Sequence, residues 1–160
     1  MAHDDVLKFS SHDLGIHCYG GVRDVKVVYA ASGHDLCTDK PAREKAAADE
    51  GRKPGFTSGP YPAFSGPAEL AWTTRDGSKL AYAIDFDTIF KDRVVLHKED
   101  PKRIYQPKPM MTDAPTVVIE IDDRTVKVYM AASLQLLPEG GDNARLDIGR
   151  NYTLAFTKKL

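Results

Sequence analysis

Four residues in the first quarter of the chain carry side chains that zinc prefers. His17 and Cys18 are adjacent, and His34 and Cys37 follow with two residues between them. Structural zinc sites take four nitrogen or sulfur ligands, so the set has the right number and type. However, neighbouring residues on a strand point to opposite faces, so His17 and Cys18 do not easily face one ion. We therefore expect ordinary histidines, no bound metal and no other cofactor.

The two cysteines leave two alternatives open. Cys18 and Cys37 are separated by a stretch that contains an expected strand. A disulfide closing a loop of this size would stabilise the fold by about 3 kcal/mol, because it constrains the unfolded chain. Free cysteines, in contrast, commonly pack as small apolar side chains. The sequence allows either a Cys18–Cys37 disulfide or two free thiols, and neither cysteine has the features of an activated nucleophile.

Acidic residues offer a second kind of chemistry. Asp85 and Asp87 stand two positions apart in IDFDTIF and would share one face if a strand continued there. Paired carboxylates can act as general acid and base, but at strand ends they more often cap turns. The sequence has no G-x-S-x-G motif and no glycine-rich phosphate loop. We therefore expect a protein without catalytic chemistry of its own.

The segment 52–67 (RKPGFTSGPYPAFSGP) is rich in proline and glycine and contains the aromatic residues Phe56, Tyr61 and Phe64. Its four prolines and three glycines exclude a helix or a central strand, so we expect a long, ordered loop. The aromatic side chains have two interpretations. They either pin the loop to the core or serve as rigid anchors for a partner.

A second proline-rich loop is expected over 98–115 (KEDPKRIYQPKPMMTDAP). It contains basic residues together with side chains that supply adaptable contact area, namely Lys102, Arg103, Tyr105, Lys108 and Met110. Prolines reduce the entropy that such a loop loses on binding. The basic residues have two interpretations: they are simply solvated, or they attract an acidic partner. In either case the loop is a candidate recognition surface.

Two hairpins give the clearest structural signal. AELAWTTR and KLAYAID, within 68–85, flank an Asp76-Gly77 pair that is typical of tight turns. Alternation places Trp72 and its even-numbered neighbours on the inner face. The second hairpin covers 116–131, where TVVIEI and TVKVYMA are rich in β-branched residues.

Further strands are expected at 6–9, 14–18, 25–31, 94–97, 134–137 and 152–157, with turns at the glycine pairs 20–21 and 140–141. The segment 39–51 (DKPAREKAAADEG) has the Asp, early Pro, helix formers and final Gly of a short surface helix. The whole pattern predicts one domain over 1–160. Its fold is expected to be all-β and mainly antiparallel, a two-sheet β-sandwich of which an immunoglobulin-like arrangement is one form.

Composition excludes several classes of partner. The 160 residues include 22 basic and 23 acidic side chains, for a net charge of -1, so no overall field attracts nucleic acid or anionic lipid. The polar N-terminus resembles neither a secretory signal nor a membrane span. We expect a cytoplasmic protein, or a periplasmic one if an upstream signal was removed. The sequence leaves the oligomeric state open.

The block 58–90 combines GPYP, FSGP, a strand with Trp72, the Asp76-Gly77 turn and AYAIDFDTIF. It resembles small β-rich bacterial proteins associated with type VI secretion, including immunity-like proteins near lipase effectors. The later hairpin VIEIDDRTVKVYMA is similar to that group too. The resemblance implies a protein that binds and neutralises a toxic enzyme. Members are often periplasmic lipoproteins, and this sequence departs from them in having no lipid-attachment cysteine near its start.

The sequence therefore predicts a non-catalytic binding protein, an immunity-type inhibitor that occludes a secreted, lipase-like toxic enzyme through its loops. The expected contact residues are Phe56, Tyr61, Phe64, Lys102, Arg103, Tyr105, Lys108 and Met110. The alternative is a small hydrolase or carbohydrate-active protein with a cleft between the two loops. That protein would use Asp85, Asp87 or His97.

Overall fold

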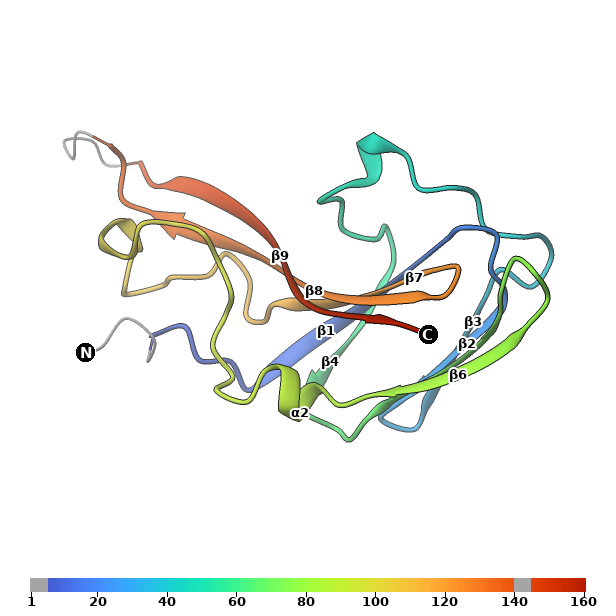
Figure 1. Ribbon diagram of the computed structural model, residues 1–160. Coiled ribbons are helices and arrows are strands. Elements are labelled where there is room, and N and C mark those ends of the chain that lie inside the picture. The colour runs from blue at the N-terminus through green and yellow to red at the C-terminus, as the bar shows by residue number, and fades with distance from the viewer. Residues whose placement is uncertain (1–5, 140–144) are drawn as a thin grey trace.

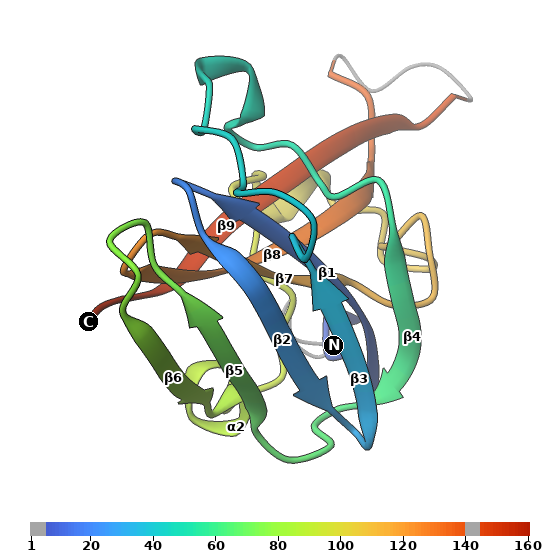
Figure 2. The same ribbon diagram turned by 90° about the vertical axis from the view of Figure 1, so that its right-hand side faces the viewer.

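The computed structural model describes residues 6–139 and 145–160, which form two β-sheets packed face to face (Figure 1, Figure 2). The five-stranded sheet has the order β4-β1-β7-β8-β9, and the four-stranded sheet has the order β3-β2-β5-β6. The first sheet consists of β1 (Ser11–Tyr19), β4 (Thr57–Pro62), β7 (Thr116–Asp122), β8 (Thr125–Leu136) and β9 (Asp147–Lys159). The second consists of β2 (Arg23–Tyr29), β3 (Ser32–Leu36), β5 (Ala68–Thr73) and β6 (Lys79–Ile84).

All neighbouring strands are antiparallel except β1 and β7, which are parallel. This confirms the prediction of a mainly antiparallel, two-sheet β-sandwich. Both predicted hairpins are present, as β5–β6 and β7–β8. The inner faces meet as the alternation predicts, with Val27, Trp72 and Ile119 buried between the sheets. Burial of these apolar side chains is the main force that holds the sheets together.

The end of the sandwich where β1 passes into β2 is tightly built. Gly20 and Gly21 both have positive φ angles, of 70° and 77°, which a glycine adopts without strain. A Cβ atom at Gly20 would collide with the carboxylate of Asp122. Nearby, the indole N–H of Trp72 donates a hydrogen bond of 2.7 Å to the carbonyl of Asp123, which links the two sheets.

The predicted helix over 39–51 is wrong. That segment contains only a single 3-10 turn, η1 (Ala47–Asp49), because its backbone is held by other partners. The amides of Gly20 and Gly21 bond to the carbonyls of Arg43 and Ala42, which keeps this part extended along the chain at the β1–β2 turn. Alanines alone offer too little apolar area to dock a helix against the sheet.

Other boundaries differ from the predicted ones. The strands expected at 6–9 and 94–97 are reduced to one bridge between Lys8 and Val94. The expected strands 134–137 and 152–157 belong to the longer β8 and β9. Strand β3 was not predicted, and neither were two short helices, α2 (Phe86–Ile89) and η2 (Pro101–Arg103). The Gly140-Gly141 turn lies outside the described residues.

The segment 52–67 is not entirely a loop, because it contains β4. Prolines are tolerated in β4 because it is an edge strand, where a missing N–H interrupts no further pairing. The segment 98–115 likewise lies along the sheet, with bridges from Ile104 to Leu136 and from Met110 to Leu134. Within 6–139 and 145–160, no helix has the length and apolar character needed to cross a bilayer.

Candidate functional site

Residues 51–56, here called the crossing segment, run over the outer face of the five-stranded sheet. Pro54 packs directly on Gly15 of β1, where a Cβ atom would lie 2.8 Å from Cγ of the proline. Gly15 is therefore the point at which the sheet allows the segment to approach the backbone. Two hollows border the crossing segment: Pro54 lines an apolar one, and Gly51 and Lys53 line a polar one.

The first hollow, here called the edge crevice, has a volume of about 330 Å³. It opens on the side of the sandwich where β3 and β4 are the edge strands of their sheets (Figure 2). Its walls include the apolar side chains of Leu14 and Ile16 from β1, Leu36 from β3 and Pro54. Phe56 completes the lining. The crevice thus has the size and the apolar lining of a binding pocket.

Phe56 is the most exposed large apolar side chain among the described residues, with 76% of its surface accessible. It follows Pro54 and Gly55 and lines the edge crevice with them. An exposed phenylalanine at a concave apolar surface is typical of an interaction site. The structure therefore makes Phe56 available for contact, as the anchor interpretation requires.

Two histidines, His17 and His34, belong to the polar part of the edge crevice, together with Asp35 and Ser58. The Nε2 atom of His17 donates a hydrogen bond of 2.7 Å to the carbonyl of Arg52, which fixes the crossing segment. The Nε2 atom of His34 is buried and has no hydrogen-bond partner among the described residues. An unsatisfied buried polar atom is costly, so a ligand that bonded His34 would gain from satisfying it.

Tyr61 and Phe64, also expected as contact residues, are instead packed around His12. Their ring centroids lie 5.9 Å and 5.2 Å from that of the histidine. The Tyr61 hydroxyl also donates a hydrogen bond of 2.8 Å to Oγ of Ser58. The pinning interpretation therefore describes these two side chains, and only Phe56 in this loop projects into solvent.

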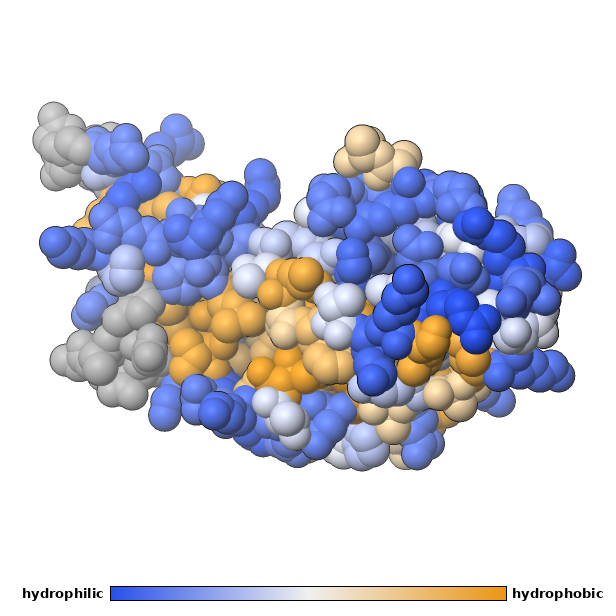
Figure 3. Space-filling view, in the orientation of Figure 1, coloured by the Kyte–Doolittle hydropathy of each residue, from blue (hydrophilic) through white to orange (hydrophobic). Residues whose placement is uncertain are grey.

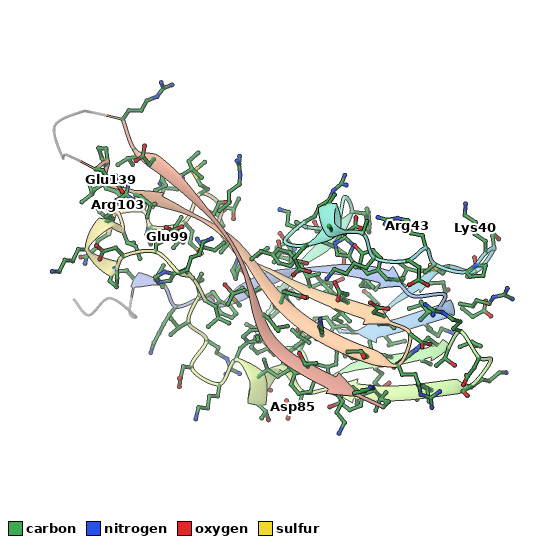
Figure 4. The ribbon with its side chains drawn as sticks, turned by 45° about the horizontal axis from the view of Figure 1, so that its top comes forward. Lys40, Arg43, Asp85, Glu99, Arg103 and Glu139 are labelled. Carbon is green, nitrogen blue, oxygen red and sulfur yellow. The ribbon has the colours of Figure 1, made fainter. Side chains whose placement is uncertain are left out.

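Of the five contact residues expected in 98–115, three make contacts within the fold and two are exposed. Arg103 donates hydrogen bonds of 3.0 Å to the carbonyl of Leu137 and to the carboxylate of Asp147, and it lies beside Glu139 (Figure 4). Met110 packs against the core. Tyr105 is half-buried, and its amide bonds to the carbonyl of Gln135. Lys102 and Lys108 are exposed.

The second hollow, here called the polar cavity, has a volume of about 300 Å³. It lies between the crossing segment and the end of the 98–115 loop, and its floor is the outer surface of β8 and β9. Figure 3 shows the corresponding dip between two raised hydrophilic regions. Its lining includes Lys53, Thr112, Ser133, Arg150 and Tyr152. A cleft between the two proline-rich loops, as the alternative function required, is therefore present.

The residues that a hydrolase would use in that cleft are elsewhere. Asp85 caps α2 by accepting hydrogen bonds from Thr88, and Figure 4 shows it beside this short helix. Asp87 forms an ion pair with Arg93, and Nδ1 of His97 accepts a bond of 3.0 Å from the amide of Glu99. None of the three lines either hollow. The convergence of carboxylates and His97 that would favour hydrolysis is not found.

The two cysteines are free thiols in the structure, each half-buried. Burial, and then the neighbouring Cys37 thiol with which it shares a hydrogen bond, raises the pKa of Cys18 above its usual range. The structure therefore contains two free thiols and no Cys18–Cys37 disulfide, and the two cysteine side chains are in contact. Among the described residues, no group of three or more His, Cys, Asp or Glu is arranged to hold a metal ion.

A buried charge cluster on the outer face of the five-stranded sheet was not predicted. Glu120 of β7 is 3% exposed, and its carboxylate lies 2.9 Å from Nζ of Lys45. The ammonium group lies 5.9 Å and 5.8 Å from the ring centroids of Tyr19 and Tyr129. A single glutamate inside the apolar run VVIEID is the sequence signal that could have indicated it.

Comparisons with protein-family models, curated proteins and solved structures gave no match for this chain. The resemblance to type VI immunity-like proteins stays a prediction.

Proposed function

We propose that this protein is a non-catalytic binding protein that holds a protein partner at the edge crevice. The observation that carries the proposal is Phe56, 76% exposed beside an apolar crevice of about 330 Å³. A partner would cover Phe56 and insert an apolar side chain between Leu14, Ile16 and Leu36. Aromatic side chains buried in this way commonly supply most of the binding energy of an interface.

The backbone beside the crevice favours an extended partner segment. Strand β4 pairs with β1 only as far as the Gly15–Thr57 register, whereas β7 continues along β1 to Tyr19. The stretch 16–18 of β1 therefore has a strand on one side only, among the described residues. An extended peptide could add there by main-chain hydrogen bonds while the crevice receives its side chain.

The resemblance of 58–90 suggests which protein the partner is. We propose that the chain acts as an immunity-type inhibitor and that the partner is a secreted toxic enzyme of the lipase-like class. Its place of action would be the periplasm if an export signal precedes the chain, and the cytoplasm otherwise. The neighbouring genes test this part of the proposal first, because an adjacent secreted lipase or other toxin is expected. Co-expression with that toxin should restore growth, whereas an unrelated protein should not, and a neighbourhood without any toxin would count against immunity.

Selection from a random-peptide display library tests the binding proposal directly. We expect the selected peptides to share an apolar anchor residue and to bind the unchanged protein in a saturable way. The Phe56→Ser variant should bind them at least about tenfold more weakly, which corresponds to about 1.4 kcal/mol. Leu154→Ser is the matched control, because Leu154 is another exposed apolar residue, 49% accessible, but lies on β9 away from the crevice.

The two variants give distinguishable results. Equal loss of binding in Phe56→Ser and Leu154→Ser would show non-specific apolar adhesion and contradict the proposal. Peptides that bind Phe56→Ser as tightly as the unchanged protein would place the binding surface elsewhere. A selection that enriches no sequence with an apolar anchor would also count against the edge crevice.

A further inference from the structure

The polar cavity has an unusual charge for a chain that is nearly neutral overall. Two cationic side chains, Lys53 and Arg150, line it, and no carboxylate does. Neither cation forms an ion pair or a side-chain hydrogen bond in the described parts of the chain. Two carboxylates outside the cavity already have partners: that of Glu120 lies 2.9 Å from Nζ of Lys45, and that of Glu99 accepts a bond of 2.9 Å from Asn151. The cavity therefore presents two uncompensated positive charges.

Hydroxyl groups surround the same space. Thr116 and Ser133 line the cavity, and neither hydroxyl is engaged in a described hydrogen bond, although Thr116 is only 5% exposed. Tyr152 adds a phenol. Burial, and then the charge of Glu120, raises the pKa of Tyr152, so its hydroxyl stays protonated and able to donate. These donors suit a ligand that has several acceptor oxygens close together.

The shape of the cavity indicates a ligand larger than a simple ion. Its floor contains the small side chain of Ala131, and Ala114 lies at its wall. These methyl groups leave a volume of about 300 Å³, which is at the lower end of the range for small-molecule pockets. An organic group could rest on the alanines while an anionic group lies between the cations.

We propose that the polar cavity binds a small phosphate monoester, with its phosphoryl group between Lys53 and Arg150 and its organic part on the alanines. A phosphate monoester carries nearly two negative charges at neutral pH, which matches the two cations, and a carboxylate carries one. Arg150 can bond two phosphoryl oxygens with its planar guanidinium group. The hydroxyls of Thr116 and Ser133 supply donors to the remaining oxygens. This site is separate from the edge crevice and does not depend on the proposed function.

Isothermal titration of the full chain with three probes tests the proposal: phenyl phosphate, inorganic phosphate and benzoate. Phenyl phosphate should bind with a stoichiometry of one and at least about tenfold more tightly than either other probe. Inorganic phosphate lacks the organic contact, and benzoate lacks the second charge. Equal affinity for all three probes would overturn the proposal.

Variants that remove one positive charge test whether phenyl phosphate binds in the polar cavity. Arg150→Gln and Lys53→Gln should each weaken phenyl phosphate binding by about tenfold or more, because each removes a charged hydrogen-bond donor. Arg23→Gln and Lys26→Gln are the matched controls, since these exposed cations lie on β2 and also form no ion pair in the described structure. Equal weakening in the controls would show general charge attraction and contradict the proposal.

A steric variant tests the site without changing charge. Ala131→Leu should fill the floor of the cavity and abolish phenyl phosphate binding. Trp72 fluorescence and thermal unfolding would establish that this variant is folded, and Ser133→Leu would replace it if it is not. Undiminished binding to a folded, filled variant would overturn the proposal. Binding that is unchanged by Phe56→Ser is expected, because Phe56 does not line this cavity.

Discussion

The hydroxyl of Tyr29 donates a hydrogen bond of 2.8 Å to Nε2 of His12 in the core between the sheets. The direction follows from the other ring nitrogen, since Nδ1 lies 2.9 Å from the carbonyl of Asp13, which can only accept. Nδ1 therefore carries the proton, and Nε2 is the acceptor. The tyrosine oxygen in turn accepts a bond of 3.0 Å from the amide of Ser65. This network is complete only while His12 is neutral.

Stability should therefore depend on pH through His12. Burial lowers the pKa of His12 below its ordinary value of 6.5, and the bond and charge of Asp13 offset this only in part. Below about pH 6.5 the unfolded chain takes up a proton at this position that the folded chain does not, so the free energy of unfolding falls as pH falls. Urea unfolding followed by Trp72 fluorescence, between about pH 7 and about pH 5, measures this slope.

Two variants distinguish the contribution of His12 to this pH dependence from that of other histidines. His12→Phe should be less stable at pH 7, because the Tyr29 hydroxyl loses its acceptor, but its stability should change less over this pH range. His17→Gln should keep the slope of the unchanged protein. A slope that persists in His12→Phe would assign the pH dependence to another group. Asp76 does not contribute over this range, because its bonds to Thr74 and Ser78 lower its pKa to about 2 and its effect on stability therefore changes only below its ordinary value of 3.8.

The buried pair of Lys45 and Glu120 leads to a prediction about stability. Lys45→Met should lower the free energy of unfolding by about 3–5 kcal/mol, because it leaves the Glu120 carboxylate buried without its partner. Adding Glu120→Leu should recover most of that loss, since the second change removes the unpaired charge. Arg75→Gln is the control: it breaks the exposed pair with Glu44 and should cost less than about 1 kcal/mol. Urea titration of all four proteins measures the differences, and a double variant as unstable as Lys45→Met would contradict this account.

The regular parts of the fold could be predicted from the sequence. Period-two alternation around Trp72 and Ile119 leaves one apolar face per strand, and that face can only be buried against another sheet. The Asp76-Gly77 turn fixes the register of the first hairpin, and Gly77 adopts a φ of 89° as such a turn requires.

The irregular parts could not be predicted because distant groups determine them. Strand β3 (SGHDL) has little β propensity of its own and forms because β2 supplies an antiparallel partner for all five of its residues. The segment 39–51 contains good helix formers. In the structure, however, Lys45 forms an ion pair with Glu120 of β7, and Arg43 forms one with Asp49. Local propensity is weak compared with such tertiary contacts.

Only part of the candidate site could be predicted from the sequence. The proline and aromatic content predicted where the loops lie. It could not distinguish Phe56, which is exposed, from Phe64, whose ring packs against that of His12. That difference depends on where β4 begins, because Phe56 precedes this strand and Phe64 follows it. The polar cavity could not be predicted at all, since Lys53 and Arg150 come from segments far apart in the sequence.

The contact between Cys18 and Cys37 leads to the last prediction. Oxidised glutathione should convert the two thiols into one intramolecular disulfide with release of two molecules of reduced glutathione. The reaction should be slow at neutral pH and faster as pH rises, because the thiolate is the attacking species and the pKa of Cys18 is raised. Closing this loop should raise the free energy of unfolding by about 3 kcal/mol. Mass spectrometry and urea titration of the oxidised and reduced forms measure both effects, with Cys37→Ser as the variant that gains no stability. Disulfides formed only between chains, or an oxidised form no more stable than the reduced one, would show that the thiol contact does not have the geometry of a native bridge.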